Sequence, residues 1–365
     1  MEYVQERVAT LHDLTGTVPE APVDRAAVVV PMTEREYAGL AAERVLSELE
    51  RVEPGSVVVP LRAAPDRVPA FESWVTEFDL PVTVLWCNGP RVESLLDEHG
   101  LDGRRGKGRD VWLALGQAVA SDAEYVAVHD ADTASYDRGY VPRLLFPLAH
   151  GFAFSKGYYA RVENGRLYGR LFRLFVVPLV RALSDAHDAP VLDYLDAFRY
   201  ALAGEFAATA DLVAGMRVHR SWGLEVATLG EAFAAAGFDG SAQVDLGTYE
   251  HDHRAVGGPT GLSDMSESVA DAFFRVVEEH GVEPAYDDLP ARYRRAARGL
   301  VRAYAADAAY NGLSYDRGSE LEQVDAYAEA VGPPGPDERL PAWRDAPVEP
   351  ARVRAAVDAD LDEVR

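Results

Sequence analysis

Short apolar runs rich in β-branched residues alternate, in the first half of the chain, with segments of helical spacing. Strands are predicted at Ala26–Val30, Ser56–Pro60, Val82–Trp86 and Tyr125–His129. Helices are predicted at Glu34–Glu50, Val68–Phe78, Val92–His99 and Lys107–Val119, where apolar residues recur every three or four positions. This alternation predicts an α/β fold with a Rossmann-like, doubly wound, mostly parallel sheet covered by helices on both faces.

The second half of the chain becomes more helical towards its end. Strands are predicted at Gly151–Tyr159 and Ala242–Leu246, and helices at Arg170–Leu183, Glu225–Ala236, Val269–Glu279 and Leu289–Ala308. We therefore expect three parts: an N-terminal extension over residues 1–25, a nucleotide-binding α/β domain over 26–255, and a mainly α-helical C-terminal region over 256–365.

Two aspartates one residue apart follow the fourth predicted strand. In an extended chain alternate side chains share a face, so Asp130 and Asp132 can both point at one hard cation such as Mg²⁺ or Mn²⁺. Ligands of open α/β sheets bind beyond the carboxyl ends of the strands, which is where this pair falls. Aspartates also start turns and cap helices, and that alternative stays open for the pair taken alone.

Three glycines and three cations stand together before the fourth predicted helix. The segment Gly103-Arg104-Arg105-Gly106-Lys107-Gly108 combines close backbone approach with positive charge and a helix N-terminus, which favours an anion such as a diphosphate. It is not a Walker loop, because the spacing and the Ser/Thr are missing. A solvated turn is the alternative. The chain has only two lysines, Lys107 and Lys156, and the position of Lys107 favours ligand contact.

Further candidates follow the Asp pair along the chain. His251 comes after the last predicted strand and could add an imidazole to the two carboxylates, but His253 shares its face in an extended chain and the choice stays open. Glu225 opens an apolar helix, where a carboxylate either meets a ligand or interacts with the helix dipole. Two cationic groups could bind an acidic acceptor or extend into solvent: Lys156, Tyr158, Tyr159 and Arg161, and then Arg170 and Arg173.

Composition limits the class of partner. The net charge of -24 over 365 residues repels nucleic acid and anionic membranes, so neither is expected as a partner. The single Cys87 excludes an internal disulfide and a thiolate zinc site, which fits the cytoplasm. The charged N-terminus does not have the pattern of a signal peptide. An acidic, lysine-poor surface suits a salt-rich cytosol, and a genome that favours arginine codons is the alternative.

Seven segments, in order along the chain, are similar to the motifs of one enzyme family. They are Pro31–Glu36, Gly106-Lys107-Gly108, Asp130-Ala131-Asp132, Gly169-Arg170, Leu202–Thr209, Gly223–Val226, and Gln243–Gly247 followed by Glu250-His251. Together they resemble glucosyl-3-phosphoglycerate synthases, retaining glycosyltransferases of the GT-A fold. The resemblance covers residues 26–255.

The resemblance implies metal-dependent transfer of a hexose, with UDP-glucose favoured as donor and 3-phosphoglycerate or a similar small acid as acceptor. It implies that Asp130, Asp132 and His251 hold Mg²⁺ or Mn²⁺. Nucleotide contacts are expected from Pro31, Thr33, Glu34, Gly106, Lys107, Asp130 and Ala131. Catalytic roles are expected for Asp132, Glu205 and Glu225, and sugar or acceptor contacts for Lys156, Tyr158, Gly169, Arg170 and Gly204. The family retains the anomeric configuration by same-face attack, which requires no protein nucleophile.

Two departures from the family pattern leave the substrates open. Pro60–Asp66 replaces an Asp-Ser-Gly-Ser-Thr-Asp segment, so nucleobase recognition is expected to differ, and the acceptor loop is reduced to Tyr168-Gly169. The alternatives are a transferase with another donor or acceptor (GDP-mannose, a lipid phosphate), a nucleotidyltransferase, and a non-catalytic nucleotide-sugar binder. The C-terminal region either forms a homodimer interface, as in the resembled family, or covers the sheet.

Overall fold

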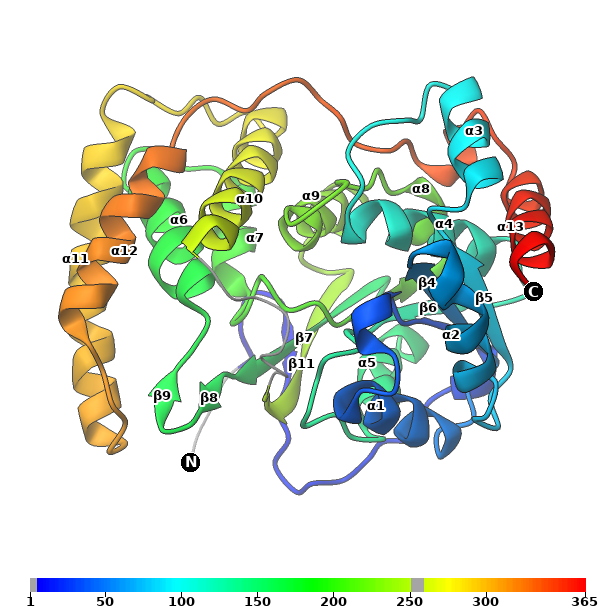
Figure 1. The fold of residues 1–365 in the computed structure, drawn as a ribbon. Helices are drawn as coiled ribbons and strands as arrows, with labels where there is room; N and C mark the ends of the chain where they lie inside the picture. Colours follow the sequence, from blue (N-terminus) through cyan, green and yellow to red (C-terminus); the bar gives the residue numbers. More distant parts are fainter. Residues whose placement is uncertain (1–4, 251–258) are drawn as a thin grey trace.

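One large mixed sheet organises the part of the chain that the computed structural model describes, residues 5–250 and 259–365 (Figure 1). Its nine strands are β1 (Ala9–Leu11), β2 (Ala26–Val29), β3 (Met32–Thr33), β4 (Ser56–Arg62), β5 (Val82–Trp86), β6 (Tyr125–Val128), β7 (Phe154–Ala160), β10 (Phe206–Thr209) and β11 (Ser241–Thr248). They lie in the order β1-β11-β7-β10-β6-β2-β4-β3, and β5 pairs with β4. A separate hairpin joins β8 (Val162–Glu163) to β9 (Arg166–Leu167).

The four strands expected in the first half of the chain are present, and they are parallel. β2 pairs with β4 and β6, and β4 pairs with β5. Every residue of β2 is buried, as a strand covered by helices on both faces requires. The predicted α/β fold with a mostly parallel sheet is confirmed.

The strand β10, which the hydrophobic pattern does not predict, runs antiparallel between β6 and β7. Its register places Phe206 opposite both Val128 of β6 and Lys156 of β7. Glu205, the residue before β10, therefore stands at the carboxyl end of β6. The Gly157 amide of β7 donates a hydrogen bond of 2.9 Å to the Glu205 carbonyl, which fixes this position.

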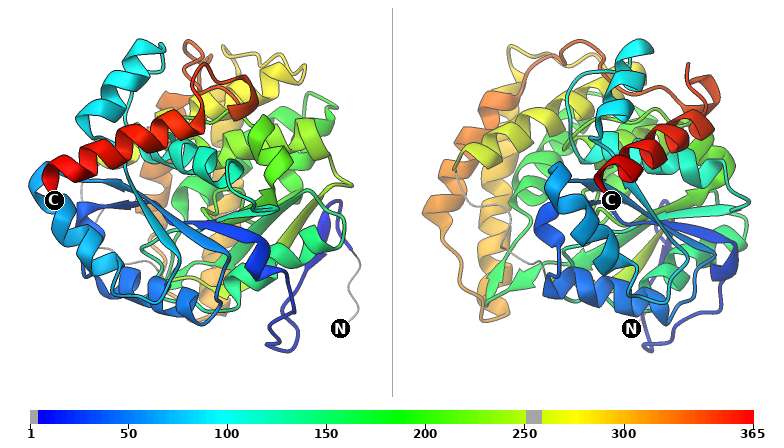
Figure 2. Two further views of the ribbon diagram at one scale, coloured as in Figure 1. Left: turned by 90° about the vertical axis from the view of Figure 1, so that its right-hand side faces the viewer. Right: turned by 45° about the vertical axis from the view of Figure 1, so that its right-hand side comes forward.

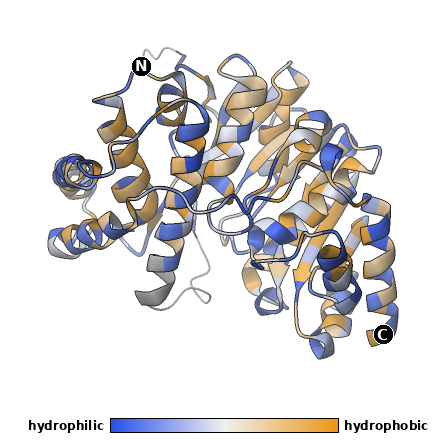
Figure 3. Cartoon of the chain, turned by 90° about the horizontal axis from the view of Figure 1, so that it is seen from above, coloured by the Kyte–Doolittle hydropathy of each residue, from blue (hydrophilic) through white to orange (hydrophobic). Residues whose placement is uncertain are grey.

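Helices cover both faces of the sheet, and in Figure 3 hydrophilic and hydrophobic residues alternate along their turns. The described helices, of which not all cover the sheet, are α1 (Leu40–Glu50), α2 (Val68–Val75), α3 (Pro90–Glu98), α4 (Lys107–Val119), α5 (Tyr140–Ala149), α6 (Val177–Ser184), α7 (Pro190–Ala197), α8 (Ala210–Gly215), α9 (Leu224–Ala236), α10 (Pro259–Glu279), α11 (Leu289–Tyr310), α12 (Arg317–Tyr327) and α13 (Pro350–Val364). The helix predicted over Glu34–Glu50 is interrupted, because Ala38 takes a positive φ of 46° before α1 begins.

The C-terminal helices occupy two places in the molecule. α10, α11 and α12 lie with α6 and α7 at one side, and a long segment then crosses to α13 (Figure 1). α13 packs against α2, α3, α4 and β5 (Figure 2). Its buried Asp360 accepts hydrogen bonds from the Arg91 and Val92 amides at the start of α3. The domain boundary near residue 255 stays a prediction. None of the described helices is long and apolar enough to span a bilayer.

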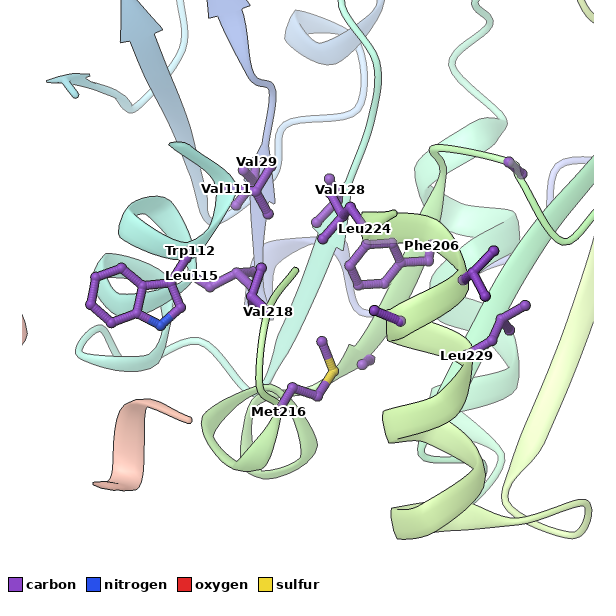
Figure 4. Close-up of a cluster of buried hydrophobic side chains, with 14 of the residues drawn as sticks. Val29, Val111, Trp112, Leu115, Val128, Phe206, Met216, Val218, Leu224 and Leu229 are labelled. Atoms are coloured by element: carbon purple, nitrogen blue, oxygen red, sulfur yellow. The ribbon is translucent and has the colours of Figure 1, made fainter. Parts of the chain in front are cut away.

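A buried apolar cluster lies directly beneath the acidic end of β6. Val128, Phe206 and Leu224 belong to it, as Figure 4 shows, and their chain neighbours include the candidate residues Asp130, Glu205 and Glu225. These apolar side chains are at most 2% exposed. Close packing of this kind fixes the backbone from which the carboxylates project.

Candidate active site

The Asp-x-Asp segment lies where expected, directly beyond the carboxyl end of β6. Asp130 is packed against Gly204, the second residue before β10. A Cβ atom on Gly204 would lie 2.3 Å from Oδ2 of Asp130, a distance that real Cβ atoms do not adopt. Glycine at 204 therefore leaves the space that the Asp130 carboxylate occupies, and this explains one position of the Leu202–Thr209 motif.

Lys107, the first residue of α4, joins two carboxylates from different elements. Its Nζ atom lies 2.6 Å from Oδ1 of Asp130 and 3.0 Å from Oε1 of Glu225, in the first turn of α9. Burial alone lowers the pKa of Lys107, but Asp130 and Glu225 outweigh burial and raise its pKa above the ordinary value. The lysine is a permanent cation at this site.

The two glycines beside Lys107 have a packing role. A Cβ on Gly106 would lie 2.6 Å from the Arg220 carbonyl oxygen, and one on Gly108 would lie 1.8 Å from the His219 carbonyl oxygen. The start of α4 can therefore press against the loop before α9, and the Arg109 amide bonds to the Arg220 carbonyl at 3.1 Å. This close approach brings Lys107 within reach of Glu225.

Glu205 is a buried carboxyl group next to the Asp pair. Burial, helped by the Asp130 charge, raises the pKa of Glu205 to about 7. Its Oε1 atom accepts a hydrogen bond of 3.4 Å from Thr133. A carboxyl group with this pKa exists in both protonation states at neutral pH, so it can accept or donate a hydrogen bond.

Lys156, the second lysine of the chain, reaches the same cluster from β7. It is completely buried, and the structure describes no hydrogen-bond partner for its Nζ atom, which lies 5.8 Å from the centre of the Phe206 ring. Burial lowers its pKa to about 8; the negative charges of Glu225, Glu205 and Asp130 oppose this shift, and Lys107 adds to it. These four groups are therefore its electrostatic neighbours.

The end of β11 is held against the residues that follow the Asp pair. Tyr249 Oη lies 3.2 Å from Thr133 Oγ1, the Ala134 amide donates to the Glu250 carbonyl at 2.8 Å, and the Glu250 amide donates to Ser135 Oγ at 3.0 Å. Burial together with the charges of Glu205, Asp132 and Asp130 raises the pKa of Tyr249. Tyr249 and Thr133 are site residues that the motifs do not reveal.

The predicted third metal ligand, His251, lies outside the described residues, as does His253. Among the described residues no three ligating side chains form a metal site. The donor set that is described still fits a hard cation, because Asp130 and Asp132 supply carboxylate oxygens and both lie close enough to Tyr249 to raise its pKa. Oxygen ligands of this kind suit Mg²⁺ or Mn²⁺.

The loops expected to contact the nucleotide follow β2 and β4. Thr33 starts a 3-10 turn and forms a capping box with Glu36. Glu34 accepts a hydrogen bond of 2.9 Å from the Ala64 amide, which ties the segment after Pro31 to the loop that departs from the family pattern. Arg62 of β4 pairs with the buried Asp110 of α4 at 3.4 Å. Arg62 belongs to Pro60–Asp66, the segment that differs from the family pattern, and the sequence alone does not predict its ion pair.

Two residues predicted to bind the substrate, Tyr158 and Arg170, make their described contacts outside the cluster around Asp130. Tyr158 Oη bonds to His12 at 2.9 Å. Arg170 pairs with Glu320 of α12 at 2.8 Å and lines a hollow of about 300 Å³. Gly169, with a φ of 75°, packs beside Tyr200. The structure thus brings together Asp130, Ala131, Asp132, Lys107, Lys156, Gly204, Glu205 and Glu225, and it places Arg170 beside the C-terminal helices.

This α/β sheet, with carboxylates and cations gathered beyond its central strand, has the arrangement of a nucleotide-sugar glycosyltransferase of the GT-A fold. No protein-family model matches the chain. It is 34% identical to glucosyl-3-phosphoglycerate synthase of Methanococcoides burtonii over 94% of this chain and 93% of that one. It is 37% identical to the Persephonella marina enzyme of the same name over 83% and 79%. The chain belongs to the glucosyl-3-phosphoglycerate synthase family.

Solved structures agree on the fold. Glucosyl-3-phosphoglycerate synthase of Mycobacterium tuberculosis in complex with Mn²⁺, UDP-glucose and phosphoglyceric acid matches 76% of this chain and 89% of that one, with a TM-score of 0.57 and 24% identity. A complex of that protein with Mg²⁺ and UDP has a TM-score of 0.56. The GT-A prediction and the predicted family are both confirmed.

Proposed function

We propose that this chain transfers glucose from a nucleoside diphosphate glucose, with UDP-glucose favoured, to the hydroxyl group of 3-phosphoglycerate. Membership of the family supports this reaction, because the relatives reported above are named glucosyl-3-phosphoglycerate synthase. The single structural observation that supports it most is the convergence of Asp130, Glu205 and Glu225 on both lysines of the chain. Such a cluster offers cations to a diphosphate and carboxylates to sugar hydroxyls.

Asp130 and Asp132, with His251, would hold the Mg²⁺ or Mn²⁺, as the donor set allows. The bound ion neutralises charge on the departing diphosphate. Lys107 sits at the start of α4, where it adds positive charge on the diphosphate side. The loops at Pro31–Glu34 and Gly106 seat the nucleotide.

Glu205 and Glu225 orient the hydroxyl groups of the donor sugar. The hydroxyl oxygen of the acceptor forms a bond to the anomeric carbon on the face that the diphosphate leaves, the carbon–oxygen bond to the diphosphate breaks, and the diphosphate takes the hydroxyl proton. Configuration is retained without a protein nucleophile. Arg170, with Gly169 before it, holds the anionic end of the acceptor.

Release of nucleoside diphosphate from a panel of UDP-, GDP- and ADP-sugars tests the proposal. The assay contains Mg²⁺ or Mn²⁺ at high salt, with and without 3-phosphoglycerate. We expect acceptor-dependent release that is lost in Asp132→Ala. Asp122→Ala is the matched control, because it removes an exposed aspartate in the turn before the same strand, at its opposite end. Release that persists in Asp132→Ala would contradict the site assignment, and release without dependence on the acceptor would contradict the acceptor.

The proposal places the reaction in the cytoplasm, which the single, buried Cys87 supports. A salt-rich cytosol would fit the acidic composition, and inactivity at high salt would count against it. A homodimer stays a prediction.

A further inference from the structure

Glu320 of α12 is a buried carboxylate that the reaction described above does not use. It is 3% exposed and lies about 150 residues from its two arginine partners in the sequence. Its Oε1 atom lies 2.8 Å from Nε of Arg170, and its Oε2 atom lies 3.2 Å from Nη1 of Arg173 and 3.3 Å from the Tyr315 hydroxyl. One carboxylate thus bridges two arginines of the segment that follows Gly169.

The partners on Arg170 leave one end of its guanidinium group available. Nε is bonded to Glu320, and Nη2 is bonded to Ser319 Oγ at 3.2 Å. The structure describes no partner for Nη1 among residues 5–250 and 259–365. A guanidinium group has five N–H donors, so three remain when these two bonds are formed. Nε and Nη2 are thus held by α12, and Arg170 also lines a hollow that it shares with Arg166 and Asp316.

Arg173 is fixed on the other side of Glu320. It is 7% exposed, its Nε donates to the Tyr168 carbonyl at 2.9 Å, and its guanidinium carbon lies 4.6 Å from the Tyr304 ring centre. It belongs to the π-helical turn Phe172–Val176, a local irregularity found at functional sites. Two guanidinium groups against one carboxylate leave a net charge of +1, which suits an anionic ligand.

We propose that Glu320 is a positioning residue for the acceptor: it holds Arg170 in the orientation that binds the anionic end of 3-phosphoglycerate. The inference rests on the proposed function, in which Arg170 binds the acceptor. Glu320 does not compete with the acceptor, because a ligand that displaced it would leave a buried carboxylate with fewer cationic partners, which is costly. The C-terminal helices thereby take part in acceptor binding.

Glu320→Gln tests the positioning role, since it preserves shape and removes the charge. We expect the KM for 3-phosphoglycerate to rise about tenfold, as loss of a charge-assisted hydrogen bond predicts. The KM for the donor and kcat at saturating acceptor should stay within about twofold. Glu320→Asp, which keeps the charge on a shorter side chain, should fall between the wild type and Glu320→Gln. Calorimetric titration of 3-phosphoglycerate without donor provides a second, activity-independent reading.

Asp360→Asn is the matched control, because Asp360 is an equally buried carboxylate on α13 that pairs with Arg91. It should lower the melting temperature without changing the KM for the acceptor. An unchanged acceptor KM in Glu320→Gln would overturn the positioning role, and a lowered KM would show that Glu320 competes with the acceptor. Arg170→Ala distinguishes failure of the positioning role of Glu320 from failure of the proposed acceptor site. If Arg170→Ala leaves acceptor binding unchanged, Arg170 does not bind the acceptor and the inference about Glu320 fails as well.

Discussion

Replacement of Lys156 by methionine should make the protein more stable and less active. Lys156 is completely buried on β7, and no described hydrogen bond compensates its charge. Asp130, Glu205 and Glu225 attract it and Lys107 repels it, and burial is the largest influence on its pKa. Methionine is a flexible, unbranched side chain of similar volume, and it removes the charge. Replacement of a buried charge by an apolar group of similar volume is often stabilising.

The magnitude follows from the pKa of Lys156, which falls from 10.5 to about 8. A difference of about 2.5 units corresponds to about 3 kcal/mol. Between pH 8 and 10.5 the unfolded chain holds the proton that the folded protein has lost, so the stability of the wild type rises with pH in this window. Below pH 8 Lys156 is charged in both states, and burial of the charge lowers the free energy of unfolding by the full amount. Lys156→Met should therefore gain about 3 kcal/mol at pH 7, and the gain should vanish near pH 10.5.

Thermal unfolding in the presence of a chelator measures this gain. For a chain of 365 residues we expect the melting temperature at pH 7 to rise by about 4 °C. Arg302→Met is the control, because it removes an exposed cation on α11 and should change stability by less than about 0.5 kcal/mol at any pH. Release of nucleoside diphosphate, measured in parallel, should fall at least about 100-fold in Lys156→Met, as loss of a charge-stabilising group predicts.

Two outcomes would refute this reasoning. A melting temperature that falls, or a gain that does not depend on pH, would mean that the Lys156 charge is compensated in the folded protein. Full activity in a stabilised variant would mean that the charge is not needed for the reaction. A stable, inactive variant would show that the buried lysine is retained for function at a cost in stability.

Two further predictions concern the groups around Asp130. Gly204→Ala should lower kcat/KM about 100-fold and weaken Mn²⁺ binding in a titration, because its Cβ would displace the Asp130 carboxylate; Gly299→Ala, at a helical position with open space, should do neither. Glu205 has its pKa raised to about 7, so between pH 4.5 and 7 the folded protein keeps a proton that the unfolded chain releases, and stability falls as pH rises. Glu205→Gln should thus be about 3 kcal/mol more stable than the metal-free wild type at pH 8 and equal to it near pH 4, and equal stability at both would contradict the shift.

The parallel half of the fold is predictable because its signals are local. Ala26–Val29 and Tyr125–Val128 are short apolar runs with few other interpretations, and Lys107–Val119 has helical spacing with a glycine before it, so the observed helix has the predicted bounds. The strand Phe206–Thr209 escapes prediction because four residues with two alanines carry little β-propensity. Its place is set by pairing with β6 and β7, which are distant in the sequence.

The site, like the fold, has a part that the sequence predicts and a part that only the folded chain shows. The motifs identify Asp130, Lys107 and Glu225 as candidates, but their mutual distances follow from packing of α4 against the loop before α9. The bridge from Glu320 to Arg170 spans 150 residues and joins α12, which carries no motif, to the start of another helical segment, where the Gly169-Arg170 motif is weak. No local pattern contains such a contact, so it can be read only from the folded chain.

The distribution of lysine supports the site independently of the motifs. Of the 36 lysine and arginine residues, only Lys107 and Lys156 are lysine, and both lie in one electrostatic cluster although α4 and β7 are far apart in sequence. Salt adaptation or codon bias would explain the many arginines, but neither explains where the two lysines remain. The chemistry of the lysine side chain explains their positions. An ammonium group is compact enough to lie 2.6 Å and 3.0 Å from two carboxylates, and it can lose its proton when buried, whereas a guanidinium group is planar and stays charged. Both lysines of the chain thus lie in the site, among the same carboxylates.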